Sequence, residues 1–373
     1  MSFHSITNHF PDFPQPTSEG KSENEKQPVL IVGQGLAGSW LSYYLWKSNI
    51  PFRVIDNFHS DSASAVAAGL MNPIVPKRLT TTWKSEELFP DFISSIYKEV
   101  QEFLQQELYF PNYLIHKIFY HPDDISAWES QRLKTQASWL GPVVHQKLHS
   151  NLTPHLGYAT IAHSGWVDIP LFIKALQKKL LSLNLLIQEP FDYSQVIESD
   201  QCILYKAHTY SKIIFCEGSQ MLKNPWFGHL PFNPTKGEEL LVYMPDLNLE
   251  QVAYAGLHII PCGNNNYLIG STFSWDDLTT KPTDWAKEQM LGKLDKLFKG
   301  SFEILEQTAG IRPASKDRRP LLGFHPQHPK LGIFNGLGTK GLLLGPLMAD
   351  YWAKNLLDQK EIDPEIHVNR LFK

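Results

Sequence analysis

The sequence predicts an α/β protein built from two parts, and three observations support this. At 373 residues the chain exceeds the roughly 100–200 residues of one typical domain. Near its start, an apolar strand at 29–32, an amphipathic helix at 36–49 and a second strand at 52–56 follow one another. Beyond Pro225, short strand-like segments separated by turn residues predict a mainly β region.

Composition narrows the classes of function. Hydrophobic residues make up 42% and charged residues 19%, which is typical of a folded globular protein. A formal net charge of −4 lacks the basic excess that nucleic-acid binding requires, so no nucleic-acid partner is expected. The three cysteines, Cys202, Cys216 and Cys262, are widely spaced and form no CxxC pair. We therefore expect neither disulfides nor a zinc site, and a cytoplasmic location.

Residues 1–27 are polar, contain proline and carry scattered charges, so they predict a flexible extension rather than a signal peptide. No apolar run approaches the roughly 18–20 residues that span a bilayer. We therefore expect no integral membrane segment.

A glycine motif joins the first strand to the first helix. Its pattern G-x-G-x-x-G is typical of a turn that lets backbone approach a pyrophosphate at a helix N-terminus. Asp56 ends the second strand, where an acidic side chain can bind ribose hydroxyls. An ordinary glycine turn is the alternative, and the motif alone does not separate FAD from NAD. The motif residues are Gly33, Gln34, Gly35, Leu36, Ala37 and Gly38.

A stretch of small residues follows at 62–73, including Ser64, Ala68 and Gly69. Such a stretch would let a flat ring system lie close to the backbone, although a surface loop is the alternative. A core strand at 212–216 ends beside Gly218.

The remaining pattern predicts further helices, further strands and one irregular segment. Helices are expected at 92–108, 171–182, 284–298 and 342–357, strands at 239–243, 257–260, 267–269 and 331–334, and irregular structure at 311–322.

These motifs, followed by Ala309–Pro313, Pro320–Gly323 and Asn335–Leu342, occur in an order that resembles the D-amino-acid oxidase superfamily. The resemblance implies FAD rather than NAD, and a Rossmann-like FAD-binding domain interleaved with a mainly β-sheet α+β substrate domain. It implies an FAD-binding domain from 28–79, 155–220 and 305–360, a substrate domain from 80–154 and 221–304, and a tail at 361–373.

The resemblance also implies site residues. Gly341, Leu342 and Leu343, with Gly338 and Lys340 before them, match positions where a helix N-terminus faces the flavin pyrimidine edge. A helix dipole there would stabilise the negative charge of reduced flavin. A plain glycine turn before a helix is the alternative, and Pro346 is expected in the first turn of that helix.

Three residues are candidates for substrate contact. Arg312 matches an arginine that holds the substrate carboxylate, and a guanidinium suits that task because it forms two charge-assisted bonds. The alternative is an ion pair with Asp317. Lys340 matches a carboxylate-binding lysine of sarcosine oxidase, and His258 matches a substrate-facing tyrosine of glycine oxidase. A satisfied core or surface histidine is equally compatible with the sequence at 258.

The resemblance therefore implies oxidation of the C–N bond of a small amine or amino acid by hydride transfer to flavin N5. No lysine occurs in 267–272, where sarcosine oxidase uses one to activate oxygen, so oxygen or another acceptor stays open. No cysteine follows Cys262, so FAD is expected to be non-covalent. A tRNA wobble-uridine demodifying oxidase and a non-catalytic flavoprotein are the alternatives. No metal site is expected, because no HExxH or comparable ligand spacing occurs.

Overall fold

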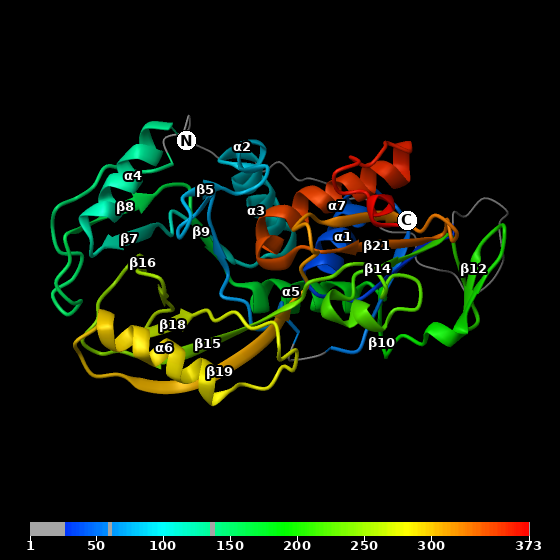
Figure 1. The fold of residues 1–373 in the computed structure, drawn as a ribbon. Helices are drawn as coiled ribbons and strands as arrows, with labels where there is room; N and C mark the ends of the chain where they lie inside the picture. The colour runs from blue at the N-terminus through cyan, green and yellow to red at the C-terminus, as the bar shows by residue number, and fades with distance from the viewer. Residues whose placement is uncertain (1–26, 59–61, 135–138, 373) are drawn as a thin grey trace, which may run out of the picture.

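A computed structural model describes residues 27–58, 62–134 and 139–372. Figure 1 shows two sheet-based halves side by side, with α1, α7 and β14 in one half and α6, β15 and β19 in the other. The predicted N-terminal extension lies, apart from Gln27, outside the described residues.

The first half is built on a six-stranded sheet with the order β10-β2-β1-β14-β21-β20. All neighbours are parallel except β20 and β21. The Rossmann-like part of the predicted fold is thus confirmed. Its strands are β1 (Val29–Val32), β2 (Phe52–Asp56), β10 (Leu186–Gln188), β14 (Lys212–Phe215), β20 (Leu321–Phe324) and β21 (Leu331–Asn335).

Different layers cover the two faces of this sheet, because successive side chains of a strand point to opposite faces. In β1, Val29 and Ile31 pack against helices, whereas Leu30 and Val32 pack against a small three-stranded sheet and the segment after β14. The helices are α1 (Leu36–Lys47), α3 (Asp91–Leu104), α5 (Ile169–Ser182) and α7 (Gly341–Asp358), and the small sheet is β11 (Val196–Glu198), β12 (Ile203–Tyr205) and β13 (His208–Tyr210).

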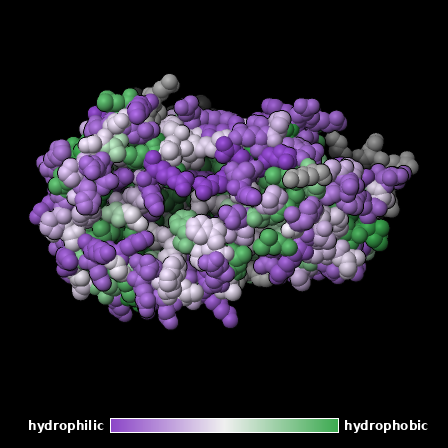
Figure 2. Space-filling model, viewed as in Figure 1, coloured by the Kyte–Doolittle hydropathy of each residue, from purple (hydrophilic) through white to green (hydrophobic). Residues whose placement is uncertain are grey.

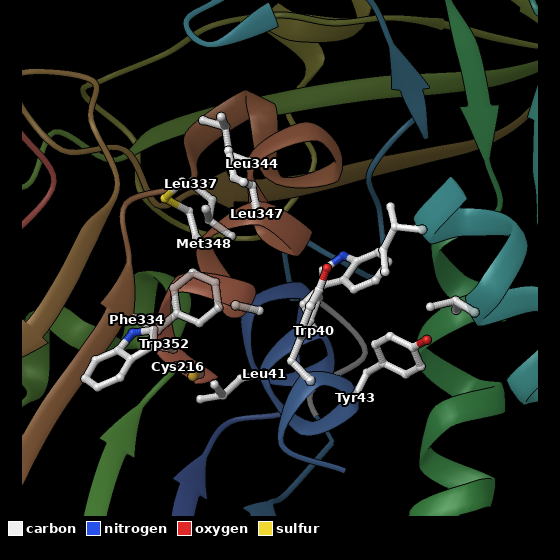
Figure 3. Close-up of a cluster of buried hydrophobic side chains, with 14 of the residues drawn as sticks. Trp40, Leu41, Tyr43, Cys216, Phe334, Leu337, Leu344, Leu347, Met348 and Trp352 are labelled. Carbon is white, nitrogen blue, oxygen red and sulfur yellow. The ribbon is translucent and has the colours of Figure 1, made fainter. Parts of the chain in front are cut away.

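Helices α1 and α7 lie against each other in the largest core, where their side chains meet in Figure 3. The approach is close because α7 presents glycine. A Cβ atom at Gly345 would lie 2.8 Å from Cδ1 of Trp40, and one at Gly341 would lie 2.6 Å from Cδ2 of Leu36. Substitution at either glycine would push the two helices apart.

The sequence predicts Pro346 in the first turn of α7, and this is wrong. Pro346 lies in the second turn, because the helix begins at Gly341. A proline has no N–H, so the carbonyl four residues earlier, at Leu342, loses its helical partner. The hydroxyl of Tyr97 on α3 donates to that carbonyl at 2.8 Å. The interruption inside the helix is therefore satisfied from a neighbouring helix.

The second half is built on a seven-stranded sheet with the order β19-β15-β18-β17-β16-β7-β8, in which only β16 and β7 are parallel neighbours. Helix α6 (Asp284–Leu297) covers one face and packs on Leu240 and Val242. The mainly β substrate part of the fold class is confirmed. Its strands are β7 (Ile115–Phe119), β8 (Gly157–Ile161), β15 (Thr235–Tyr243), β16 (Val252–Tyr254), β17 (His258–Pro261), β18 (Asn266–Gly270) and β19 (Glu303–Arg312).

The remaining elements are shorter. They are helices α2 (Ser85–Leu88) and α4 (Pro122–Lys134), strands β3 (Leu70–Met71), β4 (Ile74–Val75), β5 (Thr80–Thr81), β6 (Tyr109–Pro111) and β9 (Gly165–Val167), and single 3-10 turns at Tyr193–Gln195, Gly218–Lys223, Gly338–Lys340 and Val368–Leu371.

Two sequence predictions about elements are wrong. Residues 311–322 are not irregular throughout, since Ile311 and Arg312 end β19 and Leu321 begins β20. The helix expected at 92–108 stops at Leu104, because Gln105 adopts the left-handed conformation with φ 54°. The short strands β6 and β7 then follow, and their pairing partners lie far away in the sequence.

Hydrophilic side chains dominate the face drawn in Figure 2, where hydrophobic residues form small separate groups. Among the described residues, no helix is both long enough and apolar enough to cross a bilayer.

Candidate functional site

The glycine motif forms a tight turn between β1 and α1. Gly33 has φ +97°, and a Cβ atom there would lie 2.6 Å from the carbonyl oxygen of Cys216 on the neighbouring strand end. A Cβ atom at Gly38 would lie 1.8 Å from the carbonyl oxygen of Gly33. Both positions therefore require glycine, as the sequence motif predicts.

The carboxylate of Asp56 closes this turn from the end of β2. Its Oδ2 accepts the backbone N–H of Gln34 at 2.6 Å, and its Oδ1 accepts the N–H of Phe58 at 2.5 Å. The Gln34 side chain points the other way, into the interior, where its Nε2 donates to Ser39 at 3.0 Å. Each oxygen of Asp56 keeps lone pairs for a further donor such as a ribose hydroxyl.

The small-residue stretch after β2 reaches α1 through the side chain of Ser64. Ser64 Oγ accepts the N–H of Leu36 at 2.9 Å, one of the first free donors of the helix that Ala37 continues. Further on, Ala68 and Gly69 lie against β9, where the Ala68 carbonyl accepts Trp166 Nε1 at 2.8 Å. A Cβ atom at Gly69 would lie 2.1 Å from the Val167 carbonyl oxygen, so β9 by itself requires this glycine.

The N-termini of α1 and α7 meet, because Gly341 packs on Leu36. Each helix N-terminus bears a partial positive charge from unpaired N–H groups. Two such termini side by side favour an anionic ligand more than either does alone. Leu342 and Leu343 follow Gly341 as buried residues of the first turn of α7.

Gly218 and Gly338 begin the 3-10 turns that follow β14 and β21. Both have positive φ, +54° and +52° respectively. Gly218 faces open space, and its carbonyl oxygen accepts the side-chain amide of Asn335 at 2.9 Å. The loops after β14 and β21 are thereby joined, as expected where two parallel strands end at one edge of the sheet.

Arg312 ends β19 on the sheet face opposite α6. Its Nη1 donates to the carbonyls of Lys236 and Thr272, at 3.3 and 3.2 Å, and its Nη2 donates to Ser271 Oγ at 2.7 Å. The guanidinium also stacks on Phe273, 4.5 Å from the ring centroid. Burial lowers the pKa of this guanidinium, which a nearby carboxylate partly offsets.

The ion pair considered as an alternative role for Arg312 does not form. Asp317 instead accepts from Arg370 Nε at 2.9 Å, at the surface. Arg312 is thus anchored by neutral oxygens, and three of the five N–H groups of its guanidinium are used.

Two further ionisable side chains share this sheet face with Arg312. Glu239 on β15 and His258 on β17 both pair with Gly270 of the strand between them. Burial raises the pKa of Glu239 to about 7, with Arg312 acting in the opposite direction. Burial likewise lowers the pKa of His258 to about 4, so its imidazole is neutral at physiological pH.

Lys340 stands at the start of α7 and faces this group. Its Nζ donates to Asn72 Oδ1 at 2.9 Å, and burial lowers its pKa to about 8. Its charge contributes to the lowered pKa of His258, which places the two side chains within electrostatic reach of each other. The structure thus brings together Arg312, Lys340 and His258, the three side chains that the sequence selects for substrate contact.

Glu239 is the member of this group that sequence reasoning missed. Its neighbour Glu238 makes the pair look like the solvated start of a strand. Only the alternation of β15 separates them: Glu238 points toward α6 and accepts from Thr283 at 2.7 Å, whereas Glu239 points toward Arg312. The available signal was the alternation within the strand, since Gly237 and Leu241, on the same face as Glu239, are uncharged.

The site therefore offers two kinds of recognition at once. Helix N-termini and glycine turns on one side suit a phosphorylated nucleotide. A buried guanidinium and a lysine on the other side suit a small carboxylate.

This chain is similar to several known proteins. Glycine oxidase of Bacillus subtilis (strain 168) is 23% identical over 374 residues, covering 92% of this chain and 96% of the relative. The tRNA 5-methylaminomethyl-2-thiouridine biosynthesis bifunctional protein MnmC of Legionella pneumophila (strain Corby) is 23% identical over 391 residues, covering 90% of this chain and 55% of that protein. The crystal structure of iminodiacetate oxidase from Chelativorans sp. BNC1 superposes with TM-score 0.77 at 19% identity, covering 92% of this chain and 98% of that chain.

The family model described as DAO, FAD dependent oxidoreductase, matches residues 28–355, from β1 through most of α7. The match includes both the glycine turn and the sheet face that bears Arg312. This chain therefore belongs to the DAO family of FAD-dependent oxidoreductases.

Proposed function

We propose that this enzyme oxidises the C–N bond of a small amino acid or a related amine. The observation that supports this most is Arg312, a partly buried guanidinium that keeps two N–H groups for a ligand after its three hydrogen bonds. Because the arginine is held by a backbone carbonyl of β15 and by Ser271 and Thr272 just beyond β18, it is oriented before any substrate binds. Such an oriented fork fits a carboxylate and fixes the atoms beside it.

Residues at the two helix N-termini fit FAD. A Cβ atom at Gly33 or Gly38 would collide with backbone, so the turn is shaped by glycine, and the α1 terminus lies against that of α7. We propose that this turn and Asp56 hold the adenosine and pyrophosphate portions, and that the first turn of α7 lies beside the flavin. FAD, when bound, supplies the two-electron oxidation.

Three side chains, Arg312, Lys340 and His258, bind and orient the substrate. Arg312 binds the carboxylate and thereby positions the carbon that bears nitrogen. Lys340 adds a second positive charge near this position while it is protonated, and its bond to Asn72 holds it there. Neutral His258 stays uncharged beside them, so it can accept a hydrogen bond without repelling a cationic substrate.

The names of related proteins suggest which substrates to test first. Glycine oxidase and iminodiacetate oxidase both act on molecules in which a carboxylate lies one carbon from nitrogen. That spacing fits a site in which one guanidinium holds the carboxylate. We propose glycine, sarcosine, iminodiacetate, D-alanine and L-proline as the panel.

The experiment is anaerobic reduction of the FAD-loaded protein, followed by visible absorbance. At least one member of the panel should bleach the flavin, and readmitting oxygen or adding an artificial acceptor should restore its colour. A protein that binds FAD and is reduced by dithionite but by no amine would overturn the proposal, and would indicate a non-catalytic flavoprotein.

A further inference from the structure

Among the described residues, six buried side-chain nitrogen or oxygen atoms lack a hydrogen-bond partner. Two of the six, Glu239 Oε2 and His258 Nε2, lie on strands that flank the same residue, Gly270. A buried polar atom without a partner costs free energy, so a pair of them on one sheet face needs a reason.

A narrow slot separates the side chains of Glu239 and His258. Glu239 and His258 are both paired with Gly270, so on this face no side chain stands between them. A Cβ atom at Gly270 would lie 2.8 Å from Cγ of Glu239 and would fill that space. The slot therefore has a glycine floor and one ionisable wall on each side, on the face where Arg312 ends β19.

Both walls present acceptors rather than donors. The Gly270 backbone acts to raise the pKa of His258, and the ring atom Nε2 has no partner. A neutral imidazole that donates through Nδ1 has a bare lone pair on Nε2. Glu239 Oε2 accepts whenever the carboxyl is ionised. Such a slot fits a group with at least two N–H bonds.

We infer that Glu239 and His258 form the subsite for the substrate's nitrogen, in which Glu239 removes the proton that an ammonium must lose before oxidation. This inference rests on the proposed function, since it assigns the nitrogen of the amine whose carboxylate Arg312 holds. The step balances: one N–H bond of the ammonium breaks, one O–H bond forms on Glu239, and a neutral amine with its lone pair remains.

The charged surroundings favour this exchange. Three groups face Glu239: Arg312 from β19, His258 across Gly270 from β17, and Cys262 from just beyond β17. Lys340, at the start of α7, acts on His258. Burial holds the pKa of Glu239 at about 7, so the carboxyl gains and loses a proton near neutral pH. A general base with such a pKa is suited to working at that pH.

The test compares Glu239→Gln with Glu306→Gln, a control on the exposed part of β19. The rate constant for anaerobic flavin reduction, divided by the substrate dissociation constant, is measured from pH 6 to 9.5 with the best substrate of the panel. Wild type should lose activity below about pH 7 as Glu239 becomes protonated. Glu239→Gln should fall about 100-fold at pH 7 and recover toward wild type at pH 9.5, where more substrate amine is already neutral.

Acetate, which has the carboxylate but no nitrogen, provides the second measurement. It should bind wild type, Glu239→Gln and Glu306→Gln within about twofold of one another, read from the perturbed flavin spectrum. Reduction of Glu239→Gln with the pH profile of wild type would overturn the nitrogen subsite while leaving amine oxidation intact. Wild type without an acid limb near pH 7 would overturn it too, even if the variant did not fold. Failure of every amine to reduce wild type would instead overturn the proposed function and the subsite with it.

Discussion

The glycine turn between β1 and α1 differs from the sheet face that bears Arg312 and Glu239 in the kind of contact that defines it. Around Gly38 the requirement is for backbone space, and the atom that a Cβ there would meet belongs to Gly33, five residues earlier in the sequence. Around Arg312 and Glu239 it is for side chains, and it is met by strands far apart in the sequence whose register brings them together. The difference teaches that a glycine turn can be specified largely by its own sequence, whereas a cluster of polar side chains is specified only through the tertiary fold.

The largest effect should come from a substitution in the glycine turn. In Gly38→Ala the new Cβ would meet the Gly33 carbonyl oxygen at 1.8 Å and its carbonyl carbon at 2.9 Å, and backbone atoms cannot move aside as a flexible side chain can. We expect loss of about 4 kcal/mol or more of stability and loss of bound FAD. Gly292→Ala in α6 is the control, since nothing lies within 4 Å of its Cβ. Thermal unfolding should show the control to be as stable as wild type or slightly more so. Retention of FAD by Gly38→Ala would contradict the turn geometry.

The next effect tests the substrate side. Arg312→Ala should lower kcat/KM about 100-fold through a raised KM, because a buried carboxylate would lose its charged partner. Arg312→Lys should restore only part of the loss, since lysine lacks the planar fork. FAD content should not change in either variant. The control is Arg319→Ala, which removes a surface partner of Glu365. A KM for Arg312→Ala equal to that of the control would show that the carboxylate binds elsewhere.

An intermediate effect concerns acid stability. The pKa of His258 is lowered to about 4, below its unfolded value, so the unfolded chain binds more protons between about pH 6.5 and 4. Stability should therefore fall as the pH drops through this window, by roughly 2 kcal/mol from this residue. In His258→Gln the decline should be shallower, whereas His208→Gln on exposed β13 should follow wild type. Chemical denaturation at a series of pH values measures the difference, and parallel curves for all three proteins would argue against a buried neutral imidazole.

The smallest effect concerns the contact between α3 and the proline-interrupted helix α7. Tyr97→Phe removes the hydroxyl that donates to the Leu342 carbonyl and should cost about 1–2 kcal/mol, since that carbonyl has no other helical donor. Tyr243→Phe, at an exposed position, should be neutral. Denaturant unfolding compares them. Equal stability of the two variants would mean that another group satisfies the carbonyl.

Much of the local structure was predictable because it depends on neighbours in the sequence. Strand β1, helix α1 and the place of Asp56 at the end of β2 follow from apolar runs, glycine spacing and one acid. Whether these residues touch FAD stays a prediction, as do the domain boundaries.

What the sequence could not predict depends on pairing across long distances. Strand β19 was missed before Ile311 because half of its residues are polar, and only pairing with β15 makes it a strand. Glu239 was missed because one residue of register decides whether a glutamate faces α6 or Arg312. The donor from Tyr97 to the interrupted helix could not be foreseen from Pro346 alone.

The contact of Gly341 with Leu36 also has a consequence for biosynthesis. Helix α1 emerges early from the ribosome and α7 late, so the two helix N-termini can meet only after nearly the whole chain has been made. Newly synthesised molecules must wait in a cofactor-free form whose Trp40 lacks its cover, and abundant FAD should then drive the last docking event by mass action. Supplying riboflavin to the expression host should accordingly raise the yield of intact enzyme.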